Sequence, residues 1–135
     1  MATERARNPW GIYLYHEAEN IVELRWLPST ADMGDPGMRA SLALFALQAE
    51  ILRPKYLLVD GLEFHHRPVE GFVPWRNDCI IPRYGSAGVQ KFAFIVPAGF
   101  PGTMESGGKE QIDGPAIFPT AWFSERKNAL EWFRR

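Results

Sequence analysis

Short apolar runs and one strictly alternating stretch predict the strands of a sheet. Residues 56–60 (YLLVD) and 91–96 (KFAFIV) are almost wholly apolar, which is typical of strands buried on both faces of a mostly parallel sheet. In residues 20–27 charged and apolar side chains alternate, and this period of two predicts a strand with one buried face. We expect residues 11–16 and 20–27 to pair as an antiparallel hairpin at the start of the sheet.

Apolar residues at three- and four-residue spacing predict helices between these strands. The first helix is expected over residues 35–53, with Asp35 as its N-cap and Pro54 ending it. A second is expected over residues 69–84, where Pro82 ends or kinks it. A last strand over 116–122 and a terminal helix capped by Ser124 complete the chain. The residues expected to form the two apolar helix faces are Met38, Leu42, Phe45, Ala49 and Leu52 in the first helix and Ala129, Leu130 and Phe133 in the last.

This order of elements predicts an α/β fold. We expect one domain with a mixed sheet of about five strands, beginning with the antiparallel hairpin and carrying helices packed on it. A chain of 135 residues, 46% of them hydrophobic, is long enough to bury one core. Residues 1–10 are mostly polar and are expected to be a flexible N-terminal segment.

Charge and cysteine content narrow the functional classes. The formal net charge of −1 argues against a nucleic-acid-binding protein, which usually carries a basic face. Cys79 is the single cysteine, so no internal disulfide can form and a reducing compartment fits best. The first residues lack the apolar core of a signal peptide, and no apolar run approaches the length needed to cross a bilayer. We therefore expect a cytoplasmic protein with no transmembrane segment.

The loop after residues 56–60 is where a site is expected, because open α/β sheets bind ligands beyond the carboxyl ends of their strands. Asp60 can act there as a base or bind a ligand hydroxyl, although an Asp before Gly more commonly hydrogen-bonds its own turn. His65 and His66 are adjacent, so they point in different directions and lack the spacing of metal ligands. We predict no metal, no cofactor and no catalytic residue.

An apolar pocket is the alternative use of this region. Phe64, Trp75 and Tyr84, with Phe72, can line such a pocket beside Asp60 and the two histidines. Residues 97–115, rich in glycine and proline, form a longer connection than most and can roof it. Cys79 is expected to be an inert residue on the apolar helix face. Residues 107–109 (GGK) lack the spacing of a phosphate-binding loop.

The opening hairpin and three later segments resemble the STAS and SpoIIAA-like superfamily, small α/β domains related to the anti-sigma-factor antagonists of sporulation. The segments are residues 56–61 (YLLVDG), 88–97 (GVQKFAFIVP) and the ending 121–133, which is most similar to the bacterial SpoIIAA-like branch. The resemblance implies a mixed sheet of about five strands. It also implies, in regulatory members, a phosphorylated Ser at the start of the helix after the strand matching 56–60. Residues 61–69 contain no Ser or Thr, so the resemblance does not extend to that switch.

The leading hypothesis is therefore a non-enzymatic binding or regulatory module. The surface around residues 61–69 and the second helix is expected to meet a protein partner or a small apolar ligand. A homodimer is also expected to be feasible, since the hairpin leaves a strand edge that can pair. The alternative is a small-molecule-binding protein or an enzyme, with Asp60, His65 and His66 facing a pocket roofed by residues 97–115.

Overall fold

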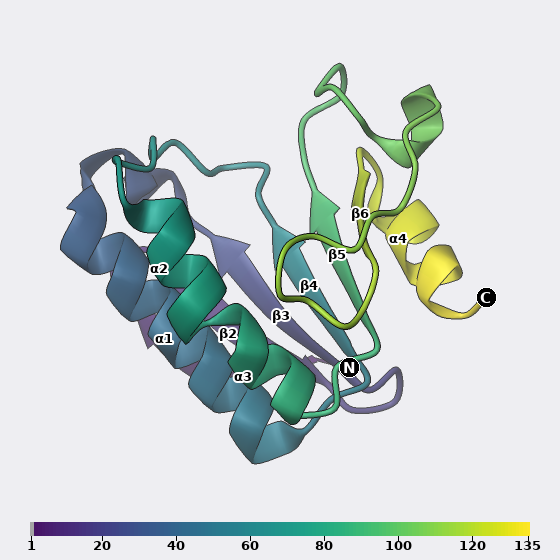
Figure 1. Ribbon diagram of the computed structural model, residues 1–135, viewed down its shortest axis with the longest axis horizontal. Coiled ribbons are helices and arrows are strands. Elements are labelled where there is room, and N and C mark those ends of the chain that lie inside the picture. The colour runs from purple at the N-terminus through teal and green to yellow at the C-terminus, as the bar shows by residue number, and fades with distance from the viewer. Residues whose placement is uncertain (1) are drawn as a thin grey trace.

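A six-stranded mixed sheet forms the centre of the molecule in the computed structural model, which describes residues 2–135 (Figure 1). Neighbouring strands follow the order of the sequence. The first three strands are antiparallel, and the third to sixth are parallel. The α/β class and the antiparallel start are thus confirmed, with one strand more than the expected five. The strands are β1 (Ala2–Asn8), β2 (Gly11–His16), β3 (Ile21–Trp26), β4 (Tyr56–Asp60), β5 (Lys91–Ile95) and β6 (Thr120–Phe123).

The additional strand is β1, which lies within residues 1–10. The prediction that this segment is flexible is therefore wrong for residues 2–8. The strand is polar and exposed, and it pairs with β2 at the edge of the sheet through its main chain. An edge strand needs no apolar side chains, because its backbone hydrogen bonds do not depend on them. Asn8 ends the strand: its side-chain nitrogen donates to Ser41 Oγ at 2.9 Å, and its oxygen accepts from the backbone of Trp10 and Gly11.

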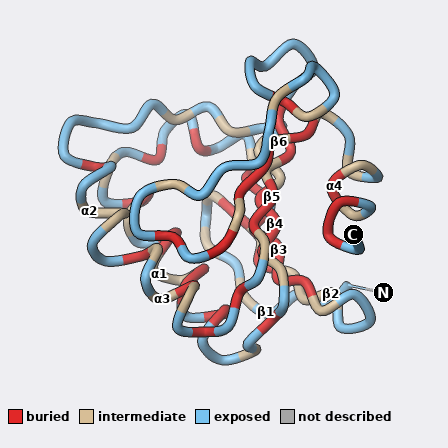
Figure 2. The backbone as a smooth tube through the Cα atoms, turned by 45° about the vertical axis from the view of Figure 1, so that its right-hand side comes forward, coloured by how far each residue is buried: buried red, intermediate tan, exposed pale blue. Residues whose placement is uncertain are grey.

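Helices cover both faces of the sheet. The helices α1 (Gly34–Leu52), α2 (Phe72–Cys79) and α3 (Ile81–Ser86) lie on one face, and α4 (Arg126–Phe133) lies on the other (Figure 1). In β4, Leu57 and Val59 belong to the core under α1–α3, whereas Leu58 packs with the α4 side. Figure 2 shows the buried residues gathered along these central strands. The continuous apolar pattern of 56–60 therefore reflects burial on both faces, as expected of parallel strands.

Aromatic rings fill the core under α1–α3. Phe45 on α1 is fully buried. The ring centroids of Tyr13, Tyr84 and Phe92 lie 6.2, 5.8 and 6.2 Å from its own. On the other face, Trp132 and Phe133 of α4 are buried beside β4–β6. Within residues 2–135, none of the helices combines the length and apolar character that crossing a bilayer requires.

The second predicted helix is two helices. The chain breaks at Ile80, whose φ and ψ of −114° and −56° separate α2 from α3, and Pro82 occupies the first turn of α3. Proline has no N–H to continue the helical ladder, so a break before it is the expected consequence. Ile80 enters the core, while Cys79 is exposed. The prediction that Cys79 is a core residue is therefore wrong.

The long connection between β5 and β6 is ordered by contacts with α4. It contains the 3₁₀ turn η2 (Met104–Ser106) and a bridge between Gln111 and Thr120. The strand β6 begins at Thr120, later than the predicted residue 116. Glu105 accepts hydrogen bonds from the backbone of Ser124 and Glu125 at 2.9 and 3.3 Å. Glu105 thus holds the chain just before α4; the N-cap position is Glu125, without a side-chain cap, and the prediction that Ser124 caps the helix is wrong.

Candidate functional site

A cavity of about 560 Å³ lies between residues 97–119 and the face of the sheet on which α1–α3 pack. Its lining is predominantly aromatic and aliphatic. We call it the aromatic cavity. Its volume falls within the range of small-molecule sites. Aromatic side chains from β3, β5 and β6 form the floor, α1–α3 form one wall, and the long connection forms the roof. The floor residues are Trp26, Phe92, Phe94 and Trp122; the roof residues are Asp113, Ala116 and Phe118.

The cavity arises where helical cover ends. The helix α1 packs over β2 and β3, and Tyr84 of α3 packs on Phe92 of β5 with ring centroids 5.5 Å apart. Phe94 and Trp122, farther along β5 and β6, are left half-buried beside the long connection. In Figure 1 the yellow-green segment after η2 crosses in front of β4 and β5. Phe94 and Trp122 stack on neighbouring strands with their ring centroids 5.7 Å apart, yet both remain only half-buried. A flat aromatic floor is therefore accessible from within the cavity.

Charged side chains enter the lining at two points. Arg76 comes from α2, and Asp113 comes from the roof. The roof rests on α2 next to Arg76, since the Cα of Gly114 adjoins the Asn77 side chain closely enough that an added Cβ would lie 3.6 Å from it. The arrangement of a mostly apolar wall with few polar groups is typical of sites that bind small organic molecules.

Comparison with protein-family models, with curated proteins and with solved structures gives no match.

The predicted aromatic residues divide between the cavity and its surroundings. Phe64 and Tyr84 line the cavity, as does Phe72. Trp75 lies outside the lining: its ring packs against Phe72 with centroids 5.9 Å apart, and the Arg39 guanidinium lies 5.0 Å from its centroid. Trp75 follows Phe72 by three residues, so the two rings are neighbours on α2, but Trp75 lies against Arg39 of α1 and Phe72 reaches the cavity.

The two histidines do not face the cavity together. His65 is exposed, and its backbone N–H donates to Thr30 Oγ1 at 2.8 Å. The ring of His66 lies edge-on to Phe64, with centroids 6.1 Å apart, and its Nε2 is buried without a hydrogen-bond partner. Within residues 2–135, no cluster of acidic, His or Cys side chains is suited to holding a metal ion.

Asp60 lies on the opposite face of the sheet, so the prediction that it shares a pocket with the histidines is wrong. Successive side chains of a strand point to opposite faces, and the neighbours of Asp60 in β4 place its carboxylate toward α4. Its Oδ1 accepts the backbone N–H of Leu62 at 3.2 Å, which is the turn contact expected of an Asp before Gly. Its Oδ2 accepts from Arg126 Nη2 at 3.1 Å.

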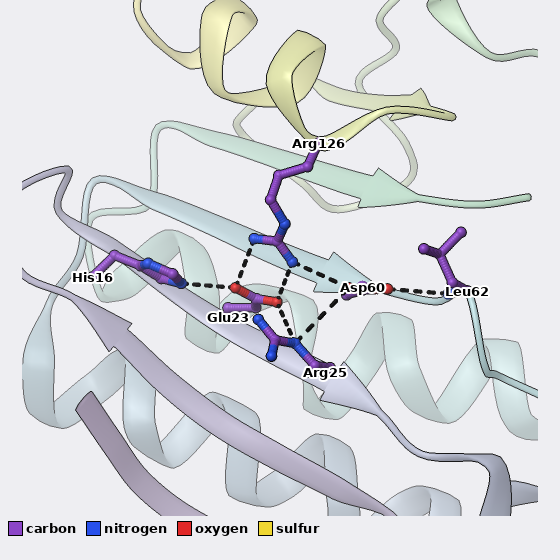
Figure 3. A network of polar contacts seen from close by, with 6 residues as sticks. All are labelled: His16, Glu23, Arg25, Asp60, Leu62 and Arg126. Atoms are coloured by element: carbon purple, nitrogen blue, oxygen red, sulfur yellow. Dashed lines mark hydrogen bonds and ion pairs between the residues drawn. The ribbon is translucent and has the colours of Figure 1, made fainter. Parts of the chain in front are cut away.

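Asp60 belongs to a network centred on Glu23, which is fully buried under the start of α4 (Figure 3). The Glu23 carboxylate accepts from His16 Nε2 at 2.7 Å and from Arg25 Nε at 3.2 Å. Arg126 donates to both of its oxygens, at 3.0 and 2.7 Å. Every Glu23 oxygen therefore has at least two donors, and the network fastens α4 to β3.

Burial and these hydrogen-bond donors have opposite effects on the pKa of Glu23. Burial by itself would raise the pKa of its carboxyl, but the hydrogen bonds from His16 and Arg126 outweigh this and lower the pKa to about 2. The alternating pattern of residues 20–27 placed Glu23 on a solvent-facing side, and no signal in that stretch showed that α4 would cover it. Because the network is internally satisfied, it serves the fold, whereas the aromatic cavity is the candidate binding site.

Proposed function

We propose that this protein is a non-enzymatic binding module that encloses a small apolar molecule in the aromatic cavity. The observation that carries the proposal is a volume of about 560 Å³ with a largely apolar lining, set between a rigid sheet and a loop roof. Burial of a ligand's apolar surface in such a cavity is favourable by roughly 25 cal/mol per Å². Of the two occupants expected from the sequence, a roofed cavity favours a small molecule over a protein surface.

The position of the ionisable groups supports binding rather than catalysis. Within residues 2–135, the charged members of the lining are Arg76 and Asp113, and the lining contains no Cys, Ser or His. The acid–base groups Glu23, Asp60 and His16 lie together on the opposite face of the sheet. A nucleophile paired with a base, which covalent catalysis requires, is not assembled around the cavity.

Kinship with the STAS and SpoIIAA-like domains is part of the proposal. The mixed sheet with its antiparallel start agrees with what the resemblance implies. Since residues 61–69 lack a phosphorylatable hydroxyl, we propose regulation by ligand occupancy instead of phosphorylation. A bacterial, cytoplasmic setting and pairing of two copies along the outer edge of β1 remain predictions.

Filling the cavity is expected to abolish ligand binding. We predict that Ala116→Trp weakens the binding of N-phenylnaphthylamine, an uncharged apolar fluorophore, by at least about tenfold, because an indole occupies volume that the ligand needs. Ala116 is a buried part of the roof. The measurement is a fluorescence titration of the full chain.

Ala18→Trp is the matched control for this substitution. Ala18 is exposed in the turn between β2 and β3, at the opposite end of β3 from the cavity residue Trp26. This variant should bind the fluorophore like the unaltered chain. Equal affinity of both variants would show that the fluorophore binds elsewhere and would remove the support for the proposal.

A further inference from the structure

Arg76 contributes a positively charged side chain to the lining of the aromatic cavity. Its Nε is buried and has no partner within residues 2–135. Its Nη2 donates to the neighbouring side chain, Asn77 Oδ1, at 3.2 Å. A guanidinium presents its donors in a planar fork that matches a carboxylate, and a buried donor left without an acceptor is unfavourable. The side chain is thus arranged to receive an acceptor that the chain itself does not supply.

The phenol of Tyr84 provides a second donor in the same lining. Burial raises the pKa of the Tyr84 hydroxyl far above its ordinary value, the nearby Tyr13 adds to the rise, and the positive charges of Arg76 and Arg83 oppose it. The hydroxyl therefore stays protonated and can donate.

Asp113 does not neutralise Arg76. No ion pair joins the two among the described residues, although both contribute to the lining. Asp113 is half-buried, and neither of its carboxylate oxygens is enclosed without a partner. Arg76 therefore brings to the lining a positive charge that Asp113 does not pair.

We infer that the ligand of the aromatic cavity is an apolar carboxylic acid, bound as its anion. The inference rests on the proposed function and names the class of ligand. The carboxylate accepts from Arg76, with the Tyr84 hydroxyl as a further donor, and the apolar body lies along the rings of Phe94 and Trp122. An uncharged alcohol of the same length would leave the guanidinium without an anionic acceptor, and an amine would place two positive charges together.

Three ligands that share one alkyl chain test the assignment. Dodecanoate, dodecanol and dodecylamine are titrated against the full-length chain, both by displacement of N-phenylnaphthylamine and directly by calorimetry. Dodecanoate is expected to bind about tenfold more tightly than dodecanol, because hydrogen bonds to charged groups contribute more than neutral ones. Dodecylamine is expected to bind most weakly.

Variants then separate the role of Arg76 from a general effect of charge. Arg76→Gln should bring the affinities for dodecanoate and dodecanol together while leaving the fluorophore bound. Arg76→Lys, which keeps the charge but loses the fork, should retain part of the preference. Arg83→Gln is the control, because Arg83 pairs with Glu50 at 2.6 Å and lies outside the cavity lining. That variant should keep the full preference for the acid.

The outcomes distinguish this inference from the proposed function. If the fluorophore binds but the acid has no advantage, or if dodecylamine binds best, the ligand class is wrong and the cavity remains a binding site. If the acid advantage persists in Arg76→Gln, whose fold is checked by thermal unfolding, the anchor is wrong. If calorimetry detects none of the three ligands and the fluorophore does not bind, both proposals fail.

Discussion

Arg126→Met is expected to lower the free energy of unfolding by about 3 kcal/mol, although Arg126 lies at the surface end of its network. Its side chain is 34% exposed, but the Glu23 side chain that it contacts is 0% exposed. The substitution removes both Arg126 hydrogen bonds to Glu23 and the one to Asp60. A buried carboxylate that loses a charged partner keeps its desolvation penalty, so breaking the pair is far more destabilising than losing a surface contact. His16 and Arg25 remain as partners, which places the effect at the low end of the range for such pairs.

Lys127→Met is the matched control on the same helix. Lys127 is 78% exposed, and its nitrogen lies 3.7 Å from Glu125. Surface ion pairs of this kind contribute little, so the free energy of unfolding should change by less than about 1 kcal/mol. Both variants are compared by urea unfolding followed through tryptophan fluorescence. If their urea midpoints coincide, the Glu23 network does not hold α4 to the sheet. In a Glu23→Gln/Arg126→Met double variant, the free energy of unfolding should fall by less than the sum of the decreases in the two single variants, since the two residues are directly coupled.

Acid is expected to remove a similar amount of stability through Glu23. Its pKa is about 2 in the folded chain, against an ordinary value of 4.5. Between these values the unfolded chain binds more protons than the folded one, so stability falls as the pH is lowered from about 4.5 toward 2 and is fully present above that window. At about 1.4 kcal/mol per pKa unit, the difference corresponds to about 3 kcal/mol. The physical cause is that protonated Glu23 no longer attracts Arg126 and His16.

Glu23→Gln isolates this contribution from other carboxylates. Glu4 and Glu50 also have lowered pKa values because each is hydrogen-bonded by an arginine, so the unaltered chain and the variant share their contributions. Urea midpoints measured at intervals from pH 5.5 to about pH 2.5 should therefore fall less steeply for the variant. The variant is less stable than the unaltered chain above this window, and the two should converge as the pH falls. Parallel curves would show that Glu23 is not the acid-sensitive group.

Local periodicity was sufficient to predict most of the elements. The alternation in residues 20–27, the apolar runs at 56–60 and 91–96 and the stripe on α1 each show which faces of one segment are buried. Such patterns depend on the spacing of side chains along a strand or helix, which sequence displays directly. The edge strand β1 carries no such pattern, because it is held mainly by main-chain pairing with β2.

Part of the candidate site could also be predicted from the sequence. Phe64 and Tyr84 were predicted to line an apolar pocket, and the structure places both in the cavity wall. Arg76 was missed, yet a signal for it existed. It lies midway between Phe72 and Ile80 at four-residue spacing, so a charged side chain interrupts an otherwise buried helix face.

The sequence by itself determined where strands and helices form and which of their side chains are apolar, because those properties follow from neighbours a few residues apart. Only the tertiary structure decided which face each polar side chain meets. Asp60 and Glu23 share one face through the register of β3 and β4, and α4 crosses that face and brings Arg126 to them. The aromatic cavity exists because a loop, and not a helix, lies over Phe94 and Trp122 on the face opposite α4. Both depend on contacts between residues far apart in the chain, which no local pattern records.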